Sequence, residues 1–208
     1  MASATGNFAG FNYEITDAQG NKTLARIYRR YLNNVCISLV MKRIVYRCPR
    51  FLLEEERITV RGKAATVRRI KNGAAVMVVP VLGKNCIVME RQRRPVVNDT
   101  IYEVPSGRIE KGETPLEAAK RELEEEIGYT AKRFTPIFDY YTDASLETQT
   151  TYCFVAEGLE KTKQRLDSDE VIKPIKMPVG KVTALIKQNR IKEIGSLCAL
   201  LHFLYIRR

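Results

Sequence analysis

Short runs of hydrophobic residues that alternate with polar ones predict that residues 41–70 form an antiparallel β-meander. We expect its half-buried strands at 44–48, 51–60 and 64–70. Arg61 and Gly62 supply a turn between the last two runs, since glycine favours tight turns.

A second group of strands is expected after residue 70. Two apolar runs, at 74–82 and 86–92, flank Gly83, Lys84 and Asn85, and this spacing predicts a hairpin with a glycine-containing turn. Further strands are expected at 101–105, 136–143 and 150–159.

Helical spacing of apolar residues appears three times, at about 115–127, at 179–188 and at 194–205. One helix lies between strands and two follow the last strand, so the chain is expected to be a mixed α/β (α+β) sandwich. Strict strand–helix alternation, which a doubly wound sheet requires, is missing. Residues 1–40 are expected to form an N-terminal extension, and within it the run 26–40 suits a strand or a short helix.

Composition narrows the class of protein. The chain has 208 residues, 45% of them hydrophobic and 28% charged, as in ordinary globular proteins. No apolar run is long enough for a membrane span, and the first residues do not resemble a secretory signal. The five cysteines form no CxxC pair, so we expect reduced thiols in the cytoplasm and no zinc site. The only histidine, His202, lies in an apolar run and is expected to be a packing residue.

The net charge of +11 is compatible with a nucleic acid, an anionic surface or a polyanionic small substrate. Residues 22–50 carry eight basic and no acidic side chains. Because no nucleic-acid-binding motif accompanies them, a nucleic-acid partner is disfavoured, and charge alone does not decide the partner.

The helix at 115–127 has well-defined ends. Thr114 is a suitable N-cap, Pro115 fits the first helical position and Glu117 completes a capping box. Gly128 suits the left-handed residue that ends a helix. At 100° per residue one apolar stripe is expected to pack on the sheet, formed by Leu116, Ala119, Leu123 and Ile127.

Three glutamates, Glu122, Glu125 and Glu126, lie on a helix arc beside this stripe. Like charges three and four residues apart oppose helix formation, and partial burial adds to the cost. A solvated acidic face paired with Arg121 is one interpretation, and a site for a hard divalent cation is the other.

The residues around the glutamates resemble the Nudix box, G-x5-E-x7-R-E-U-x-E-E-x-G-U, where U is a bulky aliphatic residue. The matching positions are Gly107, Glu113, Arg121, Glu122, Leu123, Glu125, Glu126 and Gly128. Only the last position departs, with Tyr129 in place of an aliphatic residue. The resemblance implies a Nudix-type α/β/α sandwich with a mixed β-sheet, here with an N-terminal β-rich extension.

The same resemblance implies roles for the box. Glu122, Glu125 and Glu126 would bind Mg²⁺ (or Mn²⁺), joined by the carbonyl of Ser106, and Glu125 is a ligand or the catalytic base. Gly107, Glu113, Arg121 and Gly128 would be structural, with Glu113 and Arg121 paired. A glutamate on a later loop often serves as base in such enzymes, which nominates Glu170, with Asp169 or Asp167 as substitutes.

Flanking residues resemble the ADP-ribose and nucleotide-sugar pyrophosphatases. Glu103-Val-Pro-Ser-Gly107 matches their ExPxG pattern, and residues 91–95 match RQxRP, which implies substrate contacts for Glu103 and Arg94. Two departures concern the substrate: Ala144-Ser145 replaces a usual Pro-Gly, and Arg68-Arg69 replaces a usual Arg-Glu. Arg68 is expected to bind substrate, and an added arginine favours a more anionic one.

We therefore predict an enzyme that hydrolyses the pyrophosphate bond of a nucleoside diphosphate derivative, with ADP-ribose as the leading substrate and AMP and ribose 5-phosphate as products. The alternatives are another nucleotide sugar, a dinucleotide, an oxidised nucleoside triphosphate, or a non-catalytic nucleotide-sensing or RNA-associated module. The resemblance also implies a homodimer. We expect an extension at 1–40, a meander at 41–70 that exchanges strands between subunits, and a hydrolase domain at 71–208.

Overall fold

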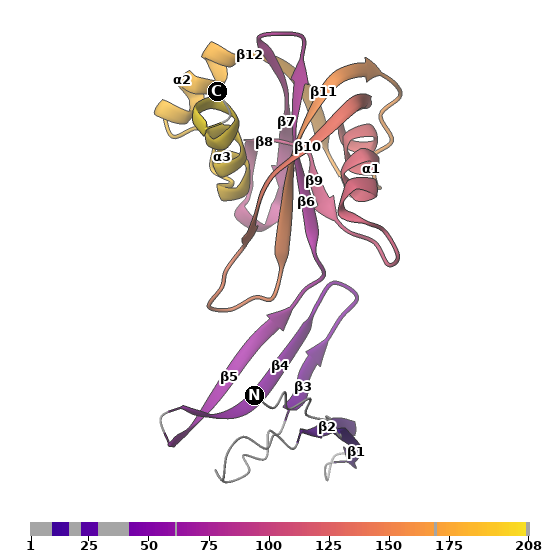
Figure 1. Ribbon diagram of the computed structural model, residues 1–208, viewed down its shortest axis with the longest axis vertical. Helices are drawn as coiled ribbons and strands as arrows, with labels where there is room; N and C mark the ends of the chain where they lie inside the picture. Colours follow the sequence, from indigo (N-terminus) through magenta and orange to yellow (C-terminus); the bar gives the residue numbers. More distant parts are fainter. Residues whose placement is uncertain (1–9, 17–21, 29–41, 61, 169, 207–208) are drawn as a thin grey trace, which may run out of the picture. The chain divides into compact units, whose positions relative to one another are not determined.

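The computed structural model describes residues 10–16, 22–28, 42–60, 62–168 and 170–206 (Figure 1). The chain divides into two compact units. One comprises Met1–Asn72 together with Asp143–Thr148, and the other comprises Gly73–Thr142 and Gln149–Arg208. None of the described helices is long and apolar enough to cross a membrane.

The N-terminal unit consists of β-strands. Strands β1 (Gly10–Thr16) and β2 (Lys22–Tyr28) form an antiparallel pair. Strands β3 (Lys42–Arg47), β4 (Leu52–Val60) and β5 (Lys63–Lys71) form the antiparallel meander expected from the alternating pattern. The β1–β2 pair was not anticipated in the polar N-terminal stretch, and most of the run 26–40, like Arg61 of the expected turn, lies outside the described residues.

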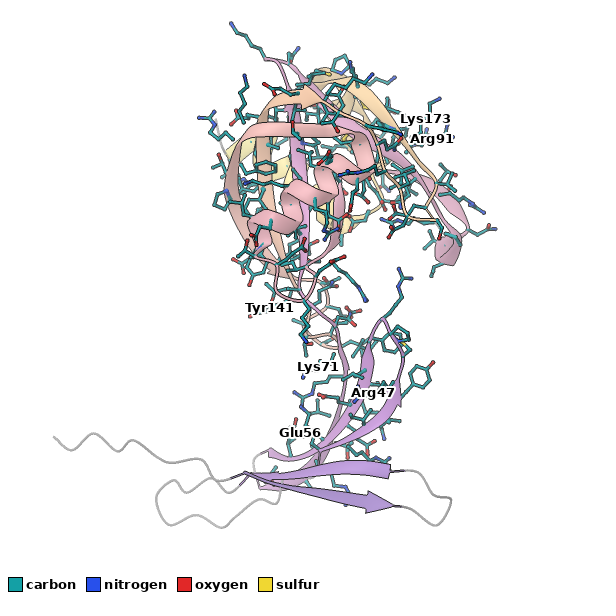
Figure 2. All side chains as sticks on the ribbon, turned by 90° about the vertical axis from the view of Figure 1, so that its right-hand side faces the viewer. Arg47, Glu56, Lys71, Arg91, Tyr141 and Lys173 are labelled. Carbon is teal, nitrogen blue, oxygen red and sulfur yellow. The ribbon has the colours of Figure 1, made fainter. Side chains whose placement is uncertain are left out.

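Opposite charges on neighbouring strands pair across the meander. On β4, Glu54 contacts Lys42 at 2.9 Å, and Glu55 contacts Arg68 at 2.9 Å. Glu56 contacts Arg69, and Figure 2 labels Glu56 on this unit. Cross-strand pairs of this kind stabilise a sheet, so Arg68 and Arg69 of β5 have structural partners within their own unit.

The second unit contains a mixed seven-stranded sheet. Its main order is β10 (Tyr129–Tyr141), β11 (Thr150–Lys161), β6 (Ala75–Leu82), β7 (Cys86–Arg94) and β12 (Ile172–Pro178). Strand β8 (Asp99–Glu103) pairs with β7, and β9 (Ser106–Arg108) pairs with β6. Only β6 and β11 run parallel; the other pairs among the described strands are antiparallel.

Helices cover both faces of this sheet (Figure 1). Helix α1 (Pro115–Ile127) lies on one face, and α2 (Val179–Lys187) and α3 (Ile194–Leu201, continued by a π-helical turn, His202–Ile206) lie on the other. The α/β/α sandwich is thus confirmed. Its long apolar strands are explained by burial on both faces.

Successive side chains of β6 and β7 point to opposite faces of the sheet and so contribute to two hydrophobic cores. Val76, Val78 and Val88 pack toward α1, against a cluster that includes Leu123. The residues between them, such as Met89, pack toward α2 and α3. Because side chains alternate every residue along a strand, Glu90 follows Val88 on the α1 face.

Three details differ from the expected elements. Leu116 is 40% exposed, and Ala118 lies in the core instead, so the buried arc of α1 is rotated toward its glutamates. Strand β10 begins at Tyr129, directly after the helix, rather than at residue 136. Strand β12 was not anticipated, because Pro174 and Pro178 disfavour a strand; it pairs only with β7, and an edge strand tolerates proline.

Candidate active site

Local capping fixes the two ends of α1. The Thr114 hydroxyl accepts a hydrogen bond from the Glu117 amide, and the Glu117 carboxylate accepts one from the Thr114 amide at 2.8 Å. Gly128 ends the helix with φ of 68°, and a Cβ there would lie 2.8 Å from the Gln164 amide nitrogen. These ends match the expected boundaries and set the rotation of the glutamate-bearing face.

Arg121 connects the loop before α1 with the glutamates on the helix. Its guanidinium donates to Glu113 at 2.8 Å and to the Arg108 carbonyl at 2.8 Å, which confirms the expected Glu113–Arg121 pair. It also donates to Glu122 at 2.8 Å and to Glu125 at 3.1 Å. One arginine therefore offsets part of the negative charge of three carboxylates.

Glu122 and Glu126 are buried although they carry carboxylates. Burial raises the pKa of Glu122 to about 7, although Arg121 opposes the rise. Burial, together with the neighbouring Glu90 and Glu122, raises the pKa of Glu126 well above its usual range. The backbone amide of Ser106 donates to the Glu126 carboxylate at 2.7 Å, so Ser106 does lie beside this glutamate.

Gly107 makes room for the Glu122 side chain. A Cβ at position 107 would lie 1.9 Å from Glu122 Oε1, far inside ordinary contact distance. Only glycine lets strand β9 approach the helix this closely, which gives a physical reason for the glycine of the box.

Glu90 is a further acidic residue of the site that sequence reasoning missed. It is 1% exposed, and burial, followed by the charge of Glu103, raises its pKa to about 8. The neighbouring Glu126 side chain partly opposes this rise in the pKa of Glu90. A single carboxylate in the apolar run 86–90 was the available signal, because a charged residue is rarely placed on the buried face of a strand without a partner.

Glu170 lies on the same side of the unit as this acidic cluster. Its charge contributes to the raised pKa values of Glu90, Glu122 and Glu126. The Glu170 carboxylate accepts a hydrogen bond from the Asp167 amide at 3.2 Å. Asp169, one expected substitute for Glu170, lies outside the described residues.

Arg94 and Glu103 form an ion pair at 2.6 Å, with Arg94 39% and Glu103 2% exposed. The register of β7 and β8 places Glu103 opposite Glu90. Glu103, followed by the negative charges of Glu126 and Glu90, raises the pKa of Arg94. This pair therefore adjoins the acidic cluster.

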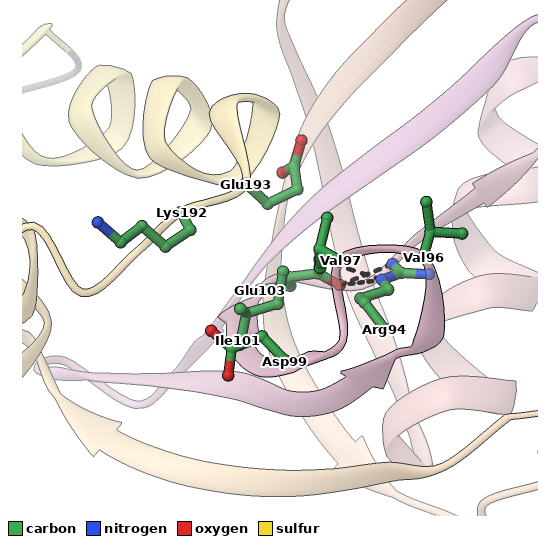
Figure 3. Close-up of a pocket in the computed structure, with 8 residues that line it drawn as sticks. All are labelled: Arg94, Val96, Val97, Asp99, Ile101, Glu103, Lys192 and Glu193. Carbon is green, nitrogen blue, oxygen red and sulfur yellow. Dashed lines mark hydrogen bonds and ion pairs between the residues drawn. The ribbon is translucent and has the colours of Figure 1, made fainter.

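A pocket of about 440 Å³ opens beside the Arg94–Glu103 pair (Figure 3). Its wall combines the turn after β7 with the two residues before α3, Lys192 and Glu193. The remaining wall is largely apolar: Val96, Val97 and Ile101, together with Asp99. Its volume lies within the range of small-molecule sites.

Arg68 lies in the other unit, on β5, where it pairs with Glu55. The expected departure at Ala144-Ser145 lies in the segment Asp143–Thr148, which packs with the N-terminal unit through hydrogen bonds between Ile70 and residues 146 and 148. The role of Arg68 as a substrate contact stays a prediction.

The described residues contain no preformed cluster of three metal-ligating side chains. In this structure Glu122 and Glu125 accept hydrogen bonds from Arg121, and Glu126 accepts one from the Ser106 amide. The donor set nevertheless suits a hard divalent cation, because it consists of carboxylate oxygens, and Glu90 Oε1 is buried without a partner among the described residues. The residues fit Mg²⁺ or Mn²⁺.

Comparison with known proteins agrees with this geometry. The NUDIX domain family matches residues 71–196. The chain belongs to the Nudix family. As a Nudix hydrolase it is 35% identical to an ADP-ribose pyrophosphatase of Bacillus subtilis (strain 168) over 141 residues, 67% of this chain and 76% of that protein. It is 31% identical to a methanol dehydrogenase activator of Bacillus methanolicus over the same shares.

A solved structure supports the fold. The crystal structure of an ADP compounds hydrolase superposes with a TM-score of 0.71 at 22% identity, covering 82% of this chain and 94% of that one. The agreement extends to the mixed sheet and few helices of a Nudix hydrolase, as expected from the sequence.

Proposed function

We propose that this Nudix hydrolase splits the pyrophosphate bond of ADP-ribose and releases AMP and ribose 5-phosphate. The observation that carries the proposal is a set of buried carboxylates: Glu122 and Glu126 on the face of α1 that meets the sheet, and Glu90 on strand β7. The similarity to an ADP-ribose pyrophosphatase supports the choice of substrate. Water adds to one phosphorus atom, and the bridging oxygen leaves with the other phosphate.

Glu122, Glu125 and Glu126 would hold Mg²⁺ or Mn²⁺, alongside the Ser106 backbone. A divalent cation bound there would offset the charge of the two phosphates and make an attacking water more acidic. To become ligands, Glu122 and Glu125 must exchange contacts with Arg121, which remains bound to Glu113 and the Arg108 carbonyl. Arg121 would therefore keep the loop and the helix in register while the cation takes over charge compensation.

Arg94 is a second cation beside the acidic cluster, in addition to Arg121, and we assign it to a substrate phosphate. Glu103 holds its guanidinium through contacts of 3.1 Å and 2.6 Å. Such a two-point contact fixes the plane of an arginine and pre-orients its remaining donors. The adjacent pocket, with walls of Val96, Val97 and Ile101, has room for one of the groups attached to the pyrophosphate.

Two residues are candidates for the general base, Glu170 and Glu125. Glu125 accepts a hydrogen bond from the Arg121 guanidinium at 3.1 Å, whereas the hydrogen bond that Glu170 accepts among the described residues comes from the Asp167 backbone amide. We favour Glu170, because its carboxylate has the weaker competing contact. Replacing each by glutamine tests the choice, because a general base produces the fall of kcat at low pH. Loss of this acidic limb in Glu170→Gln alone supports Glu170, and its loss in Glu125→Gln alone supports Glu125.

The substrate is tested with purified protein, Mg²⁺ and a panel of ADP-ribose, other nucleotide sugars, dinucleotides and nucleoside triphosphates. Products are separated by chromatography and identified by mass, with Glu126→Gln as the control. AMP and ribose 5-phosphate from ADP-ribose at the highest kcat/KM support the proposal. Preference for another compound would change the assigned substrate and leave the proposed hydrolysis of a pyrophosphate bond unchanged. Nucleotide binding without turnover would favour a sensing module.

We also propose that the protein is a cytoplasmic homodimer in which the meander at 41–70 exchanges strands between subunits. Strand β3, at one edge of that three-stranded sheet, pairs only with β4 among the described strands, and such an edge is suited to pairing with another chain. The described cysteines, Cys48, Cys86, Cys153 and Cys198, are free thiols, in keeping with a reducing compartment. Light scattering on the intact chain and on a chain lacking residues 1–72 tests the dimer, since only the intact chain is expected to dimerise.

A further inference from the structure

A single side chain, Gln164, joins three parts of the second unit. It lies in the segment of residues 162–171, which connects β11 to β12 and carries Glu170. Its Nε2 donates to the Glu126 carbonyl at 2.6 Å and to the Ile172 carbonyl at 3.3 Å. A primary amide has two donor hydrogens, so Gln164 can make both hydrogen bonds at once.

The connecting segment is held at the C-terminal end of α1. The last carbonyl groups of a helix have no partner within the helix and need donors from elsewhere. The Arg165 amide donates to the Glu125 carbonyl at 2.9 Å, and the Thr162 amide donates to the Gly128 carbonyl at 2.8 Å. The backbone of the segment is therefore tied to the helix by contacts that do not involve the Gln164 side chain.

The contact with Ile172 is different, because it joins the two ends of the part that carries Glu170. Ile172 is the first residue of β12 and is buried. The hydrogen bond from Gln164 closes the chain between these two residues into a loop, and the same amide holds the base of this loop on α1. Closing a loop reduces the number of conformations open to the residues inside it.

Glu170 lies near the end of this loop. Its amide donates to the Asp167 carbonyl at 3.1 Å, and its carboxylate accepts a hydrogen bond from the Asp167 amide at 3.2 Å. The carbonyl of the next residue, Val171, accepts one from the Arg93 amide at 3.2 Å. These contacts shape the turn around Glu170 and tie it to β7, whereas Gln164 ties both ends of the loop to the helix that carries the glutamates.

We propose that Gln164 is a positioning residue that sets the place of the Glu170 carboxylate relative to the glutamates of α1. The role rests on the proposed function, in which Glu170 is the general base. Both donors of Gln164 are used by backbone carbonyls, so its amide acts on the loop and not on the substrate. Its effect on hydrolysis therefore passes through Glu170.

The test compares Gln164→Met and Gln164→Glu with the wild type. Methionine is similar in length to glutamine and has no donor, and an ionised glutamate has the same shape and only accepts hydrogen bonds. Both variants are expected to lower kcat for ADP-ribose about 10- to 100-fold, because a displacement of about 1 Å near the reacting groups can cost about 10²-fold. The Kd for Mn²⁺ alone is expected not to rise, because Glu122 and Glu126 keep their own side-chain contacts.

Thr162→Val is the matched control. The Thr162 hydroxyl donates to the Glu124 carboxylate at 3.2 Å, so it also ties the segment to α1, but this contact does not involve β12. Its kcat is expected to equal the wild-type value. Hydrogen–deuterium exchange of the loop amides gives a reading that does not need turnover. Exchange is expected to be about fivefold faster in Gln164→Met, which corresponds to the net loss of one hydrogen bond, and unchanged in Thr162→Val.

A double variant distinguishes positioning from a general structural role. If Gln164 acts through Glu170, Gln164→Met lowers kcat no further once Glu170 has been replaced by glutamine, whereas independent effects multiply. Equal kcat values are therefore expected for Glu170→Gln and for the double variant.

Wild-type kcat in Gln164→Met or Gln164→Glu would overturn the positioning role. A double variant whose kcat falls by the full product of the two single losses would also overturn it. Wild-type kcat in Glu170→Gln would do the same, because no base would then need to be positioned there. Each of these results, with AMP still released from ADP-ribose by the wild type, leaves the proposed hydrolysis intact. Absence of hydrolysis by the wild type would overturn both.

Discussion

The contact between Gly107 and Glu122 gives the sharpest test of the site, through the variant Gly107→Ala. The added methyl carbon would lie 1.9 Å from Glu122 Oε1, 2.2 Å from Cδ and 2.6 Å from Oε2. Gly107 has no positive φ, so alanine is acceptable to the backbone and the perturbation is steric. The carboxyl group must retreat by about 1.5 Å to reach the onset of ordinary contact near 3.4 Å.

That displacement predicts both a stability cost and a larger catalytic cost. Overpacking of this kind costs about 1–3 kcal/mol of unfolding free energy. The retreat also breaks the 2.8 Å hydrogen bond from Arg121 and moves a metal-ligating carboxylate. Because a misplacement of about 1 Å near the reacting groups can cost about 10²-fold, kcat/KM for ADP-ribose is expected to fall by about two orders of magnitude. Urea unfolding and steady-state kinetics measure the two effects.

Gly73→Ala is the matched control, since a Cβ there meets nothing within 4 Å and the residue has no positive φ. It is expected to match the wild type in activity. A Gly107→Ala enzyme with wild-type kcat/KM and Mn²⁺ affinity would refute the reasoning, because it would mean that the position of the Glu122 carboxylate does not matter.

Three further predictions concern stability. Without metal, the melting temperature is expected to fall as pH rises from about 5 to about 8, because burial raises the pKa of Glu122 from 4.5 to about 7. Over this range the folded protein must give up a proton that the unfolded chain has already lost, which is equivalent to about 3 kcal/mol for Glu122. Glu122→Gln is expected to remove this part of the profile and to leave the part due to Glu90, whose pKa is raised to about 8. Arg94→Met leaves Glu103 buried without its partner and is expected to lower the unfolding free energy in urea by about 2–3 kcal/mol. This cost lies below the range for a fully buried pair, because Arg94 is partly exposed. The double variant Arg94→Met with Glu103→Leu is expected to regain most of the lost unfolding free energy. Thr114→Ala removes the capping box and is expected to cost about 1 kcal/mol; an unchanged unfolding midpoint would show that the cap does not stabilise α1.

Local signals made the central helix predictable. The N-cap Thr114 and the left-handed Gly128 are set by neighbouring residues, so the helix boundaries follow from short-range chemistry. The arrangement of Glu122 and Glu126 follows from the helical repeat once those boundaries are known. The pairing of Glu113 with Arg121 was predictable only through the resemblance to the Nudix box, because Glu113 precedes the helix and lies eight positions before Arg121.

Contacts between distant segments could not be predicted from the sequence. Glu90 and Glu126 belong to a strand and a helix 36 positions apart in the sequence, and only the packing of α1 on β7 brings their carboxyl groups together. The Arg94–Glu103 pair depends on the register of the β7–β8 hairpin, whose turn uses a left-handed Asn98. Sequence reasoning assigned both residues to the substrate and missed that they bind each other.

The most direct test of the central claim is the rate of AMP formation from ADP-ribose by the wild type and by Glu126→Gln, each with saturating Mg²⁺. Loss of an outer contact to a metal ligand costs about 10- to 100-fold, so loss of the ligand charge itself is expected to lower kcat by at least about 10²-fold. Thermal unfolding confirms that both proteins are folded. Retention of wild-type kcat by Glu126→Gln, with AMP still released, would contradict the account, because hydrolysis would then not depend on the buried carboxylates of α1.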